Sequence, residues 1–110
     1  IKFFEADCND LDKMNEIIKG NEIVYHCAAT AHEGLSVFSP NVITKNIFQA
    51  SVSSIRAAIQ YKVKRFVYAS TIYVNSNEGG FYRCSKKAAE DYIEEYYKLF
   101  GINFTILHNY

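Results

Sequence analysis

The sequence lacks the features that mark a nucleic-acid-binding or membrane protein. Its 12 basic and 12 acidic residues give a formal net charge of +0 at pH 7. Since no long run of either sign occurs, a surface that tracks phosphates is excluded and no nucleic-acid partner is expected. The longest apolar runs are far shorter than a membrane span, so we expect no membrane partner either.

Cysteine is scarce and irregularly placed. The 3 cysteines, Cys8, Cys27 and Cys84, form no CxxC pair. An odd number of widely spaced cysteines is typical of reduced thiols in the cytosol, so we expect a cytoplasmic location. The histidines stand at no metal-ligand spacing with these cysteines, and no metal site is expected.

Glycine and proline are also few, with 5 and 1 residues among 110. Without a glycine- or proline-rich linker, and without an internal repeat, the chain fits one domain. Its hydrophobic content of 49% is enough to build a core. The chain begins at Ile1, already inside an apolar run, so we expect residues 1–110 to be a fragment of a longer protein.

The apolar residues that are present follow two alternating patterns. Continuous apolar runs too short for a helix, such as Ile23–Ala29, are typical of strands buried on both faces. Strands are predicted at Ile1–Ala6, Ile23–Ala29, Arg65–Ser70 and Phe104–Leu107, and helices at Leu11–Ile18, Pro40–Tyr61 and Tyr82–Phe100. Such alternation predicts an α/β fold, a three-layer parallel sheet with helices on both faces. We expect Arg65–Ser70 to pair with both Ile23–Ala29 and Phe104–Leu107.

Parallel sheets bind ligands beyond the carboxyl ends of their strands. Thr71 stands at one such end, and Tyr82 and Lys86 open the following helix, four residues apart and so on one face. The residues that continue this face are Ala89, Ile93 and Phe100. We therefore predict that the face packs on the sheet, that Lys86 finds a polar partner there, and that Tyr82 and Thr71 share a cleft.

Several segments, in this order, carry a family resemblance. They are Val24–Ala29 (VYHCAA), Asn46, Val63–Thr71 (VKRFVYAST) and Tyr82–Lys86 (YRCSK) with Ala89 and Glu90. Together they resemble the extended short-chain dehydrogenases, a group that includes UDP-glucose 4-epimerase and the nucleotide-sugar dehydratases. The resemblance implies a partial Rossmann-like fold, from the third to the sixth strand. The glycine-rich motif that grips the dinucleotide pyrophosphate would then lie outside these residues.

The resemblance also implies a function and roles for individual residues. The chain is expected to belong to an NAD(P)-dependent sugar-nucleotide epimerase or dehydratase, with NAD favoured over NADP and a nucleotide sugar as substrate. The implied catalytic residues are Tyr82, Lys86 and Thr71; cofactor contacts are Asp7, Cys8, Ala28, Ala29 and Lys86; and substrate contacts are Ser70, Thr71 and Tyr82. A homodimer is expected to form through Pro40–Tyr61 and Tyr82–Phe100, where Ile47 and Tyr97 lie off the core stripes.

The chemistry explains why a tyrosine and a lysine are needed together. Hydride transfer from a carbinol carbon to nicotinamide requires proton transfer at its oxygen. A tyrosine pKa near 10 is about three units too high for a base at neutral pH, or roughly 4 kcal/mol. An ammonium about 4 Å away, at an effective dielectric constant of about 20, supplies roughly that amount.

Other interpretations stay open at this stage. The chain departs from the family in its short loop at Ile72–Phe81, where Asn75-Ser76 replaces a tyrosine-glycine pair, and in His108, which replaces an arginine. A non-catalytic relative that senses dinucleotide would keep the sheet but would not need the three catalytic side chains. A receiver-like interaction domain would need a cluster of acidic residues at its strand ends, and Asp7 and Asp10 match such a cluster only weakly.

Individual residues also have structural alternatives. Asp7 competes as a helix N-cap with Asp10, which is better placed. His26 and Cys27 are expected in the core rather than as ligands, and Asn46 is expected to bridge helix and strand backbones. His32 and Ser36, on the loop over the cofactor in this fold, are further candidates for contact with it.

Overall fold

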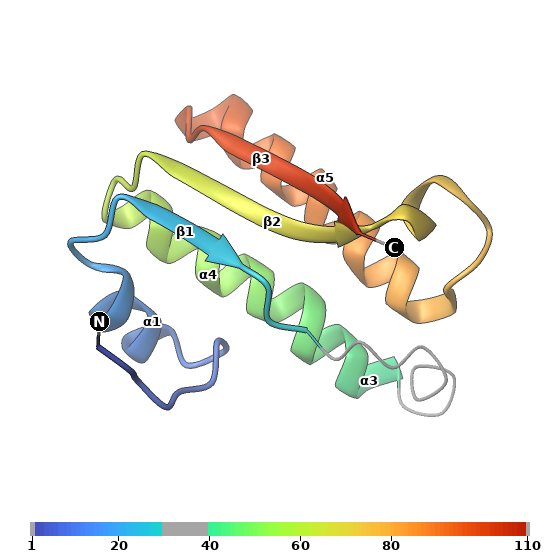
Figure 1. The fold of residues 1–110 in the computed structure, drawn as a ribbon, viewed down its shortest axis with the longest axis horizontal. Helices are drawn as coiled ribbons and strands as arrows, with labels where there is room; N and C mark the ends of the chain where they lie inside the picture. The colour runs from blue at the N-terminus through green and yellow to red at the C-terminus, as the bar shows by residue number, and fades with distance from the viewer. Residues whose placement is uncertain (1, 30–39, 110) are drawn as a thin grey trace.

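Figure 1 shows the computed structural model, which describes residues 2–29 and 40–109. His32, Ser36 and the expected helix cap at Ser39 lie outside the described residues. The elements are α1 (Leu11–Ile18), β1 (Ile23–His26), α3 (Pro40–Ile43), η1 (Thr44–Gln49), α4 (Ala50–Gln60), β2 (Arg65–Thr71), η2 (Ile72–Asn75), α5 (Gly80–Phe100) and β3 (Phe104–Asn109).

The described strands form one parallel sheet in the order β1-β2-β3. Tyr25 lies opposite Val67, and Val67 lies opposite Thr105, which confirms the predicted pairing of the three segments. In a parallel sheet all carboxyl ends meet at one edge. The end of β2 and the start of α5 therefore lie at the same edge of the molecule (Figure 1).

Local signals in the sequence set the ends of the helices. The Asp10 side chain accepts a hydrogen bond from the Lys13 backbone N–H and so caps α1. Gly101 ends α5 with a φ of 74°, a left-handed conformation that a residue with a side chain rarely adopts. Between β1 and β2, the segments α3, η1 and α4 run on as one long helix (Figure 1), as predicted, although η1 has π geometry.

The buried face of this long helix includes a residue that was expected to lie off it. Ile47 is fully buried at 0% exposure, so the prediction that it lies off the core stripe is wrong. The buried stripe runs from Ile47 through Ser51, Ser54 and Ala58. Two of these are serines, which a hydrophobicity pattern assigns to solvent. Their small side chains nevertheless allow the helix to lie close to the sheet.

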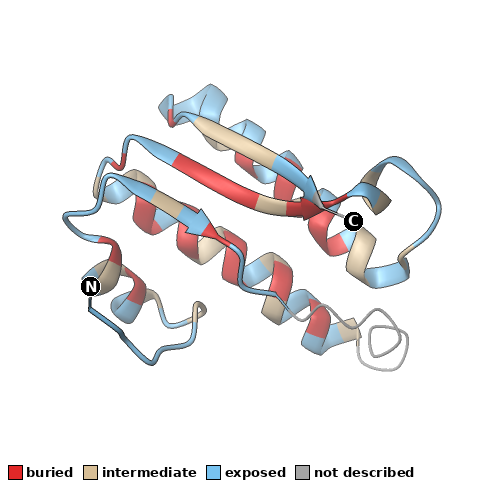
Figure 2. Ribbon diagram, in the orientation of Figure 1, coloured by how far each residue is buried: buried red, intermediate tan, exposed pale blue. Residues whose placement is uncertain are grey.

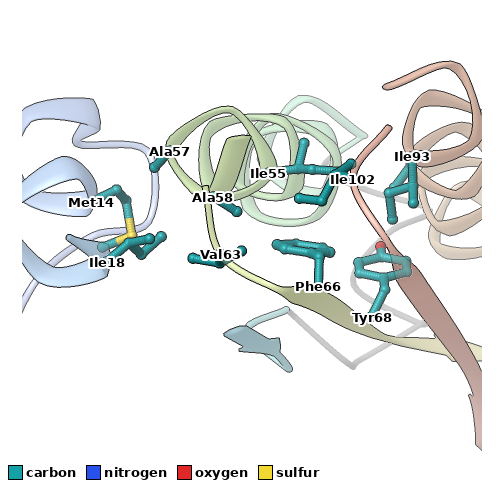
Figure 3. Close-up of a cluster of buried hydrophobic side chains, with 11 residues drawn as sticks. Met14, Ile18, Ile55, Ala57, Ala58, Val63, Phe66, Tyr68, Ile93 and Ile102 are labelled. Carbon is teal, nitrogen blue, oxygen red and sulfur yellow. The ribbon is translucent and has the colours of Figure 1, made fainter. Parts of the chain in front are cut away.

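The helices in the described part of the chain lie on one face of the sheet. Figure 3 shows Phe66 and Tyr68 of β2 pointing from the sheet toward the helices, where Ile55 of α4 and Ile93 of α5 join the same core. The two crossovers, β1 to β2 and β2 to β3, step the same way across the sheet. Because crossovers of one hand then put their helices on one side, α4 and α5 share a face.

The predicted parallel α/β sheet of Rossmann-like type is confirmed, but the described residues place no helix on its opposite face. Tyr25 is 68% exposed there and Leu107 is 47% exposed. Figure 2 shows that most of β1 is not buried, and His26 is the one buried residue of this strand. Cys27, which follows the strand, is exposed. The predictions that β1 is buried on both faces and that Cys27 lies in the core are therefore wrong.

Two apolar segments lie away from the core. Residues 2–6 are exposed and form no strand, so this segment stands apart from the sheet, as expected for a strand whose neighbours belong to a part of the fold outside residues 1–110. A strand needs a neighbour to satisfy its backbone hydrogen bonds, and none lies beside this segment in the described structure. Phe100 is 62% exposed because α5 has passed the core by its last turn, although Ala89 and Ile93 are buried as predicted.

Candidate active site

Lys86 is a buried cation at the start of α5, with only 3% of its surface exposed. Its Nζ donates a hydrogen bond to the Ala69 carbonyl oxygen at 2.6 Å. The same nitrogen lies 4.8 Å from the centre of the Tyr68 ring and 5.9 Å from the centre of the Tyr82 ring. The prediction that a core-facing lysine finds a polar partner is therefore confirmed.

The surroundings of Lys86 set its charge. Burial lowers its pKa from 10.5 to about 8, and the nearby Cys27 and Glu90 oppose that shift. A group with a pKa of about 8 is still mostly protonated at pH 7. The site therefore holds a positive charge beside the Tyr82 ring under neutral conditions.

Ser70 and Thr71 end β2 with their side chains in different environments. The Ser70 hydroxyl donates to Glu90 Oε2 at 2.5 Å, on the helix-covered side. Thr71 Oγ1 accepts the Tyr73 backbone N–H at 3.3 Å and caps η2, which leaves its own O–H proton to donate. Successive strand residues point to opposite faces, which separates the two hydroxyls. A substrate contact by Ser70 has to compete with its bond to Glu90.

Glu90 is a site residue to which sequence reasoning gave no role. It lies four residues after Lys86, is 7% exposed, and its Oε2 is 3.3 Å from His108 Nε2. The carboxylate therefore connects the ends of β2 and β3 to α5. Its position on the Lys86 face of the helix was the signal that could have found it.

A buried polar cluster lies behind Lys86. Ser51 Oγ donates to the Ile47 carbonyl oxygen at 2.6 Å, and lies 3.2 Å from His26 Nε2 and 3.3 Å from the Tyr68 hydroxyl. Burial, and then the charge of Lys86, lower the pKa of His26 to about 4. The expected core position of His26 is confirmed, because it is 4% exposed and neutral at pH 7.

This pKa predicts a loss of stability in acid. The neutral His26 stabilises the fold fully above pH 6.5, and this contribution is lost as the pH falls through about 4. The contribution is roughly 3 kcal/mol. Replacing His26 by glutamine removes the titration, so the unfolding free energy of the variant should fall less than that of the unaltered chain between these pH values in urea titrations. Parallel curves for the two proteins would contradict this prediction.

Four of the five residues expected at the cofactor lie together, and the fifth, Lys86, does not line their pocket. Asp7, Cys8, Ala28 and Ala29 line one pocket of about 240 Å³, with Asn46 on its wall. Asp7 Oδ1 accepts the Asn9 backbone N–H at 2.8 Å, and Asp10, not Asp7, caps α1. Burial raises the pKa of the Cys8 thiol, followed in effect by the charge of Asp7. The small alanine side chains at the end of β1 leave room for a ligand.

Two further findings concern the described residues only. In this part of the chain no group of three or more His, Cys, Asp or Glu side chains is placed to hold a metal ion. Among the same residues, none of the helices is both long enough and apolar enough to cross a membrane.

A comparison with known families identifies the chain. The family described as NAD dependent epimerase/dehydratase matches residues 1–110. The chain belongs to this family. No curated protein matches it. The resemblance to extended short-chain dehydrogenases is thereby confirmed, and the parallel sheet with its long α5 is the corresponding part of an epimerase/dehydratase fold.

Solved structures of this family superpose closely on the chain. UDP-glucose 4-epimerase from Thermotoga maritima, determined with UDP-glucose, has a TM-score of 0.87 and 27% identity over 96% of this chain and 40% of its own. The Thermus thermophilus UDP-glucose 4-epimerase in complex with NAD has a TM-score of 0.88 and 26% identity, over 98% and 40%. A dTDP-glucose 4,6-dehydratase from Streptomyces venezuelae shares the fold, with a TM-score of 0.88 and 22% identity over 96% and 37%.

The chain thus spans about 40% of the length of these epimerases. A nicotinamide dinucleotide is the cofactor implied by the family, and the residues present fit part of it. The pocket beside Ala28 and Ala29 is open and bears a carboxylate at Asp7, a group that can accept hydrogen bonds from a ribose or an adenine.

Proposed function

We propose that the protein carrying this chain is an NAD(P)-dependent epimerase or dehydratase of nucleotide sugars, with NAD favoured as cofactor. The observation that carries the proposal is the buried Lys86 ammonium, held beside the Tyr82 ring where α5 begins. A buried lysine is costly to a fold, so its retention at the ligand-binding edge of a parallel sheet favours a chemical role. Residues 1–110 would form one part of the dinucleotide-binding domain.

The proposed mechanism assigns one task to each side chain. The Tyr82 hydroxyl, as phenolate, takes the proton from a sugar hydroxyl and later returns it. Lys86 stabilises the phenolate through its positive charge and donates to the ribose of the cofactor. Thr71 donates its O–H to the reacting oxygen and fixes its position. A bound nicotinamide ring would supply the site that takes up and gives back the hydride.

Cofactor binding is proposed to begin at the pocket that the described residues form. Asp7 and the Cys8 backbone contact the adenine end, and Ala28 and Ala29 approach the backbone of the dinucleotide. The pyrophosphate grip is expected from residues outside this chain. We therefore propose that the 110 residues alone neither bind NAD with the affinity of an intact enzyme nor turn over substrate.

Two measurements test the proposed function. The complete protein is incubated with NAD and, in turn, UDP-glucose, UDP-N-acetylglucosamine and dTDP-glucose, and the sugar products are separated by chromatography. Conversion of at least one sugar at its carbinol carbon is expected. Calorimetry compares NAD binding by the complete protein and by residues 1–110. Tight NAD binding without conversion of any nucleotide sugar favours a dinucleotide sensor instead.

The predicted dimer is retained as a proposal, with a revised surface. Ile47 is buried, but Tyr92 and Tyr97 on α5 are 48% and 50% exposed. Phe48 meets Tyr92 edge-on with ring centroids 4.7 Å apart. Both rings line a groove of about 710 Å³ that the long helix forms with Tyr92 and with the turn before α1. A second copy that packs its own two helices here would bury these rings.

We expect Tyr92→Asp to shift the complete protein from dimer to monomer at micromolar concentration in light scattering, because it places a charge in an apolar contact. The conservative Tyr92→Phe should leave the dimer intact. A monomeric unaltered protein at the same concentration would contradict the proposed interface.

A further inference from the structure

The ring of Tyr68, a core residue of β2, lies beneath the Lys86 ammonium. It is 0% exposed, and the Lys86 nitrogen lies 4.8 Å from its ring centre, closer than to the Tyr82 ring. The negative face of an aromatic ring attracts a cation within about 6 Å of its centre, most strongly where water is excluded. The Tyr68 ring therefore compensates part of the cost of burying Lys86.

Hydrogen bonding determines the orientation of that ring. Ser51 Oγ lies 2.6 Å from the Ile47 carbonyl oxygen, 3.3 Å from the Tyr68 hydroxyl oxygen and 3.2 Å from His26 Nε2. One serine hydroxyl therefore links the hydroxyl end of the Tyr68 ring to the helix backbone and to His26. Burial raises the pKa of Tyr68, which keeps the phenol neutral. The contact with Ser51 thus fixes the hydroxyl end of the Tyr68 ring.

Stacking supplies the second constraint. The His26 and Tyr68 rings are nearly parallel, with an interplanar angle of 10° and centroids 5.8 Å apart. His26 comes from β1, Tyr68 from β2, and Ser51 from α4. Three separate elements therefore fix the plane on which the Lys86 ammonium rests.

We propose that Tyr68 is a positioning residue for Lys86, and that its ring face, locked by Ser51 and His26, holds the ammonium within reach of Tyr82 and of the cofactor ribose. The inference rests on the proposed function for its catalytic consequence. Its physical core, the support of a buried cation by a neutral ring, does not depend on that function. The titratable groups around Lys86 are Cys27, His26, Glu90, Tyr68 and Tyr82.

The first test follows the titration of Lys86 itself by NMR of its side-chain carbon resonances in the complete protein. Substituting residue 68 by phenylalanine and then by phenylalanines with increasing ring fluorination keeps the shape but weakens the negative ring face. Phenylalanine is the reference for the pKa of Lys86, which is about 8 in the unaltered chain, because it keeps the ring and its stacking on His26 and loses only the hydrogen bond to Ser51. Heavy fluorination should lower it by about one unit, because the ammonium loses its cation–π partner. An unchanged pKa across the series would overturn the inference.

The second test uses turnover. Tyr68→Leu should lower kcat/KM about tenfold at neutral pH, raise the KM for the dinucleotide, and move the alkaline limb of the pH profile to lower pH. Phe66→Leu is the matched control, since Phe66 is equally buried on the same strand and has no contact with Lys86 among those described. Equal effects of the two variants on the pH profile would mean that Tyr68 only fills space.

The two tests separate this inference from the proposed function. If the unaltered protein converts no nucleotide sugar, the function fails, yet the fluorination series still reports on Lys86. If the unaltered protein is active but the series leaves Lys86 unmoved, the positioning role fails and the function stands. The fluorinated variants differ little in shape, so the first test remains decisive if Tyr68→Leu does not fold.

Discussion

Replacing Tyr82 by phenylalanine in the complete protein is expected to lower kcat about a thousandfold, the range of a lost general acid–base group. The dissociation constant for NAD should change by less than about twofold, since the substitution removes only a hydroxyl and leaves the ring that faces Lys86. Steady-state kinetics gives the first value and calorimetry the second. A loss confined to kcat indicates an interaction made in the transition state.

The chain offers a matched control for this substitution. Tyr61→Phe removes a phenolic hydroxyl at the end of α4, a half-buried position near the opposite edge of the sheet, and should leave kcat unchanged. Equal losses of NAD affinity and of turnover in Tyr82→Phe would point to a structural role for Tyr82. They would contradict the assignment of that residue as acid and base.

Lys86→Ala is expected to damage both steps. Turnover should fall as strongly as in Tyr82→Phe, because the phenolate loses its stabilising charge. The dissociation constant for NAD should rise by about tenfold or more, since a charged hydrogen bond to the ribose contributes about 1.5–3 kcal/mol. Lys87→Ala serves as the control, because Lys87 is exposed and pairs with Asp91 at 2.9 Å. Loss of turnover with unchanged NAD affinity would contradict the ribose contact.

Stability measurements distinguish a functional role of Lys86 from a loss of activity caused by unfolding. The pKa of Lys86 is lowered from 10.5 to about 8 in the fold, so the unfolded chain binds more protons between these pH values. The free energy of unfolding therefore rises with pH between about 8 and 10.5, and this gain is lost again as the pH falls through about 8. Lys86→Met, which carries no charge, should lack this rise. An inactive Lys86→Met variant that is at least as stable as the unaltered protein at pH 7 would show that the lysine serves function.

Much of this fold could be predicted from the sequence because its strands are short apolar runs with clear ends. The run at Phe66–Tyr68 is buried in the sheet, and α5 ends at Gly101 as expected. The exposed face of β1 could not be predicted from its residues. Ile23 and Tyr25 are apolar or aromatic, so a hydrophobicity pattern predicts that they are buried, yet both are exposed. What covers a strand depends on the number and direction of the crossovers beside it.

The site was predictable in part. The four-residue spacing of Tyr82 and Lys86 correctly indicated that Lys86 faces the core. Its supporting cluster was not found, because Ser51 looks like an exposed helix residue and becomes significant only when the fold brings it beside His26 and Tyr68. Such long-range pairs leave no periodic signal in a sequence. The catalytic, cofactor and substrate roles themselves remain proposals.

The central proposal is that the carboxyl edge of this sheet supports hydride transfer at a sugar carbon. The most direct measurement uses a nucleotide sugar deuterated at its carbinol carbon, mixed with the complete protein and NAD in a single turnover. We expect deuterium on the nicotinamide ring of the reduced cofactor, and none with the Tyr82→Phe variant. Product formed without deuterium ever reaching the nicotinamide, or NAD bound tightly with no transfer from any nucleotide sugar, would contradict it.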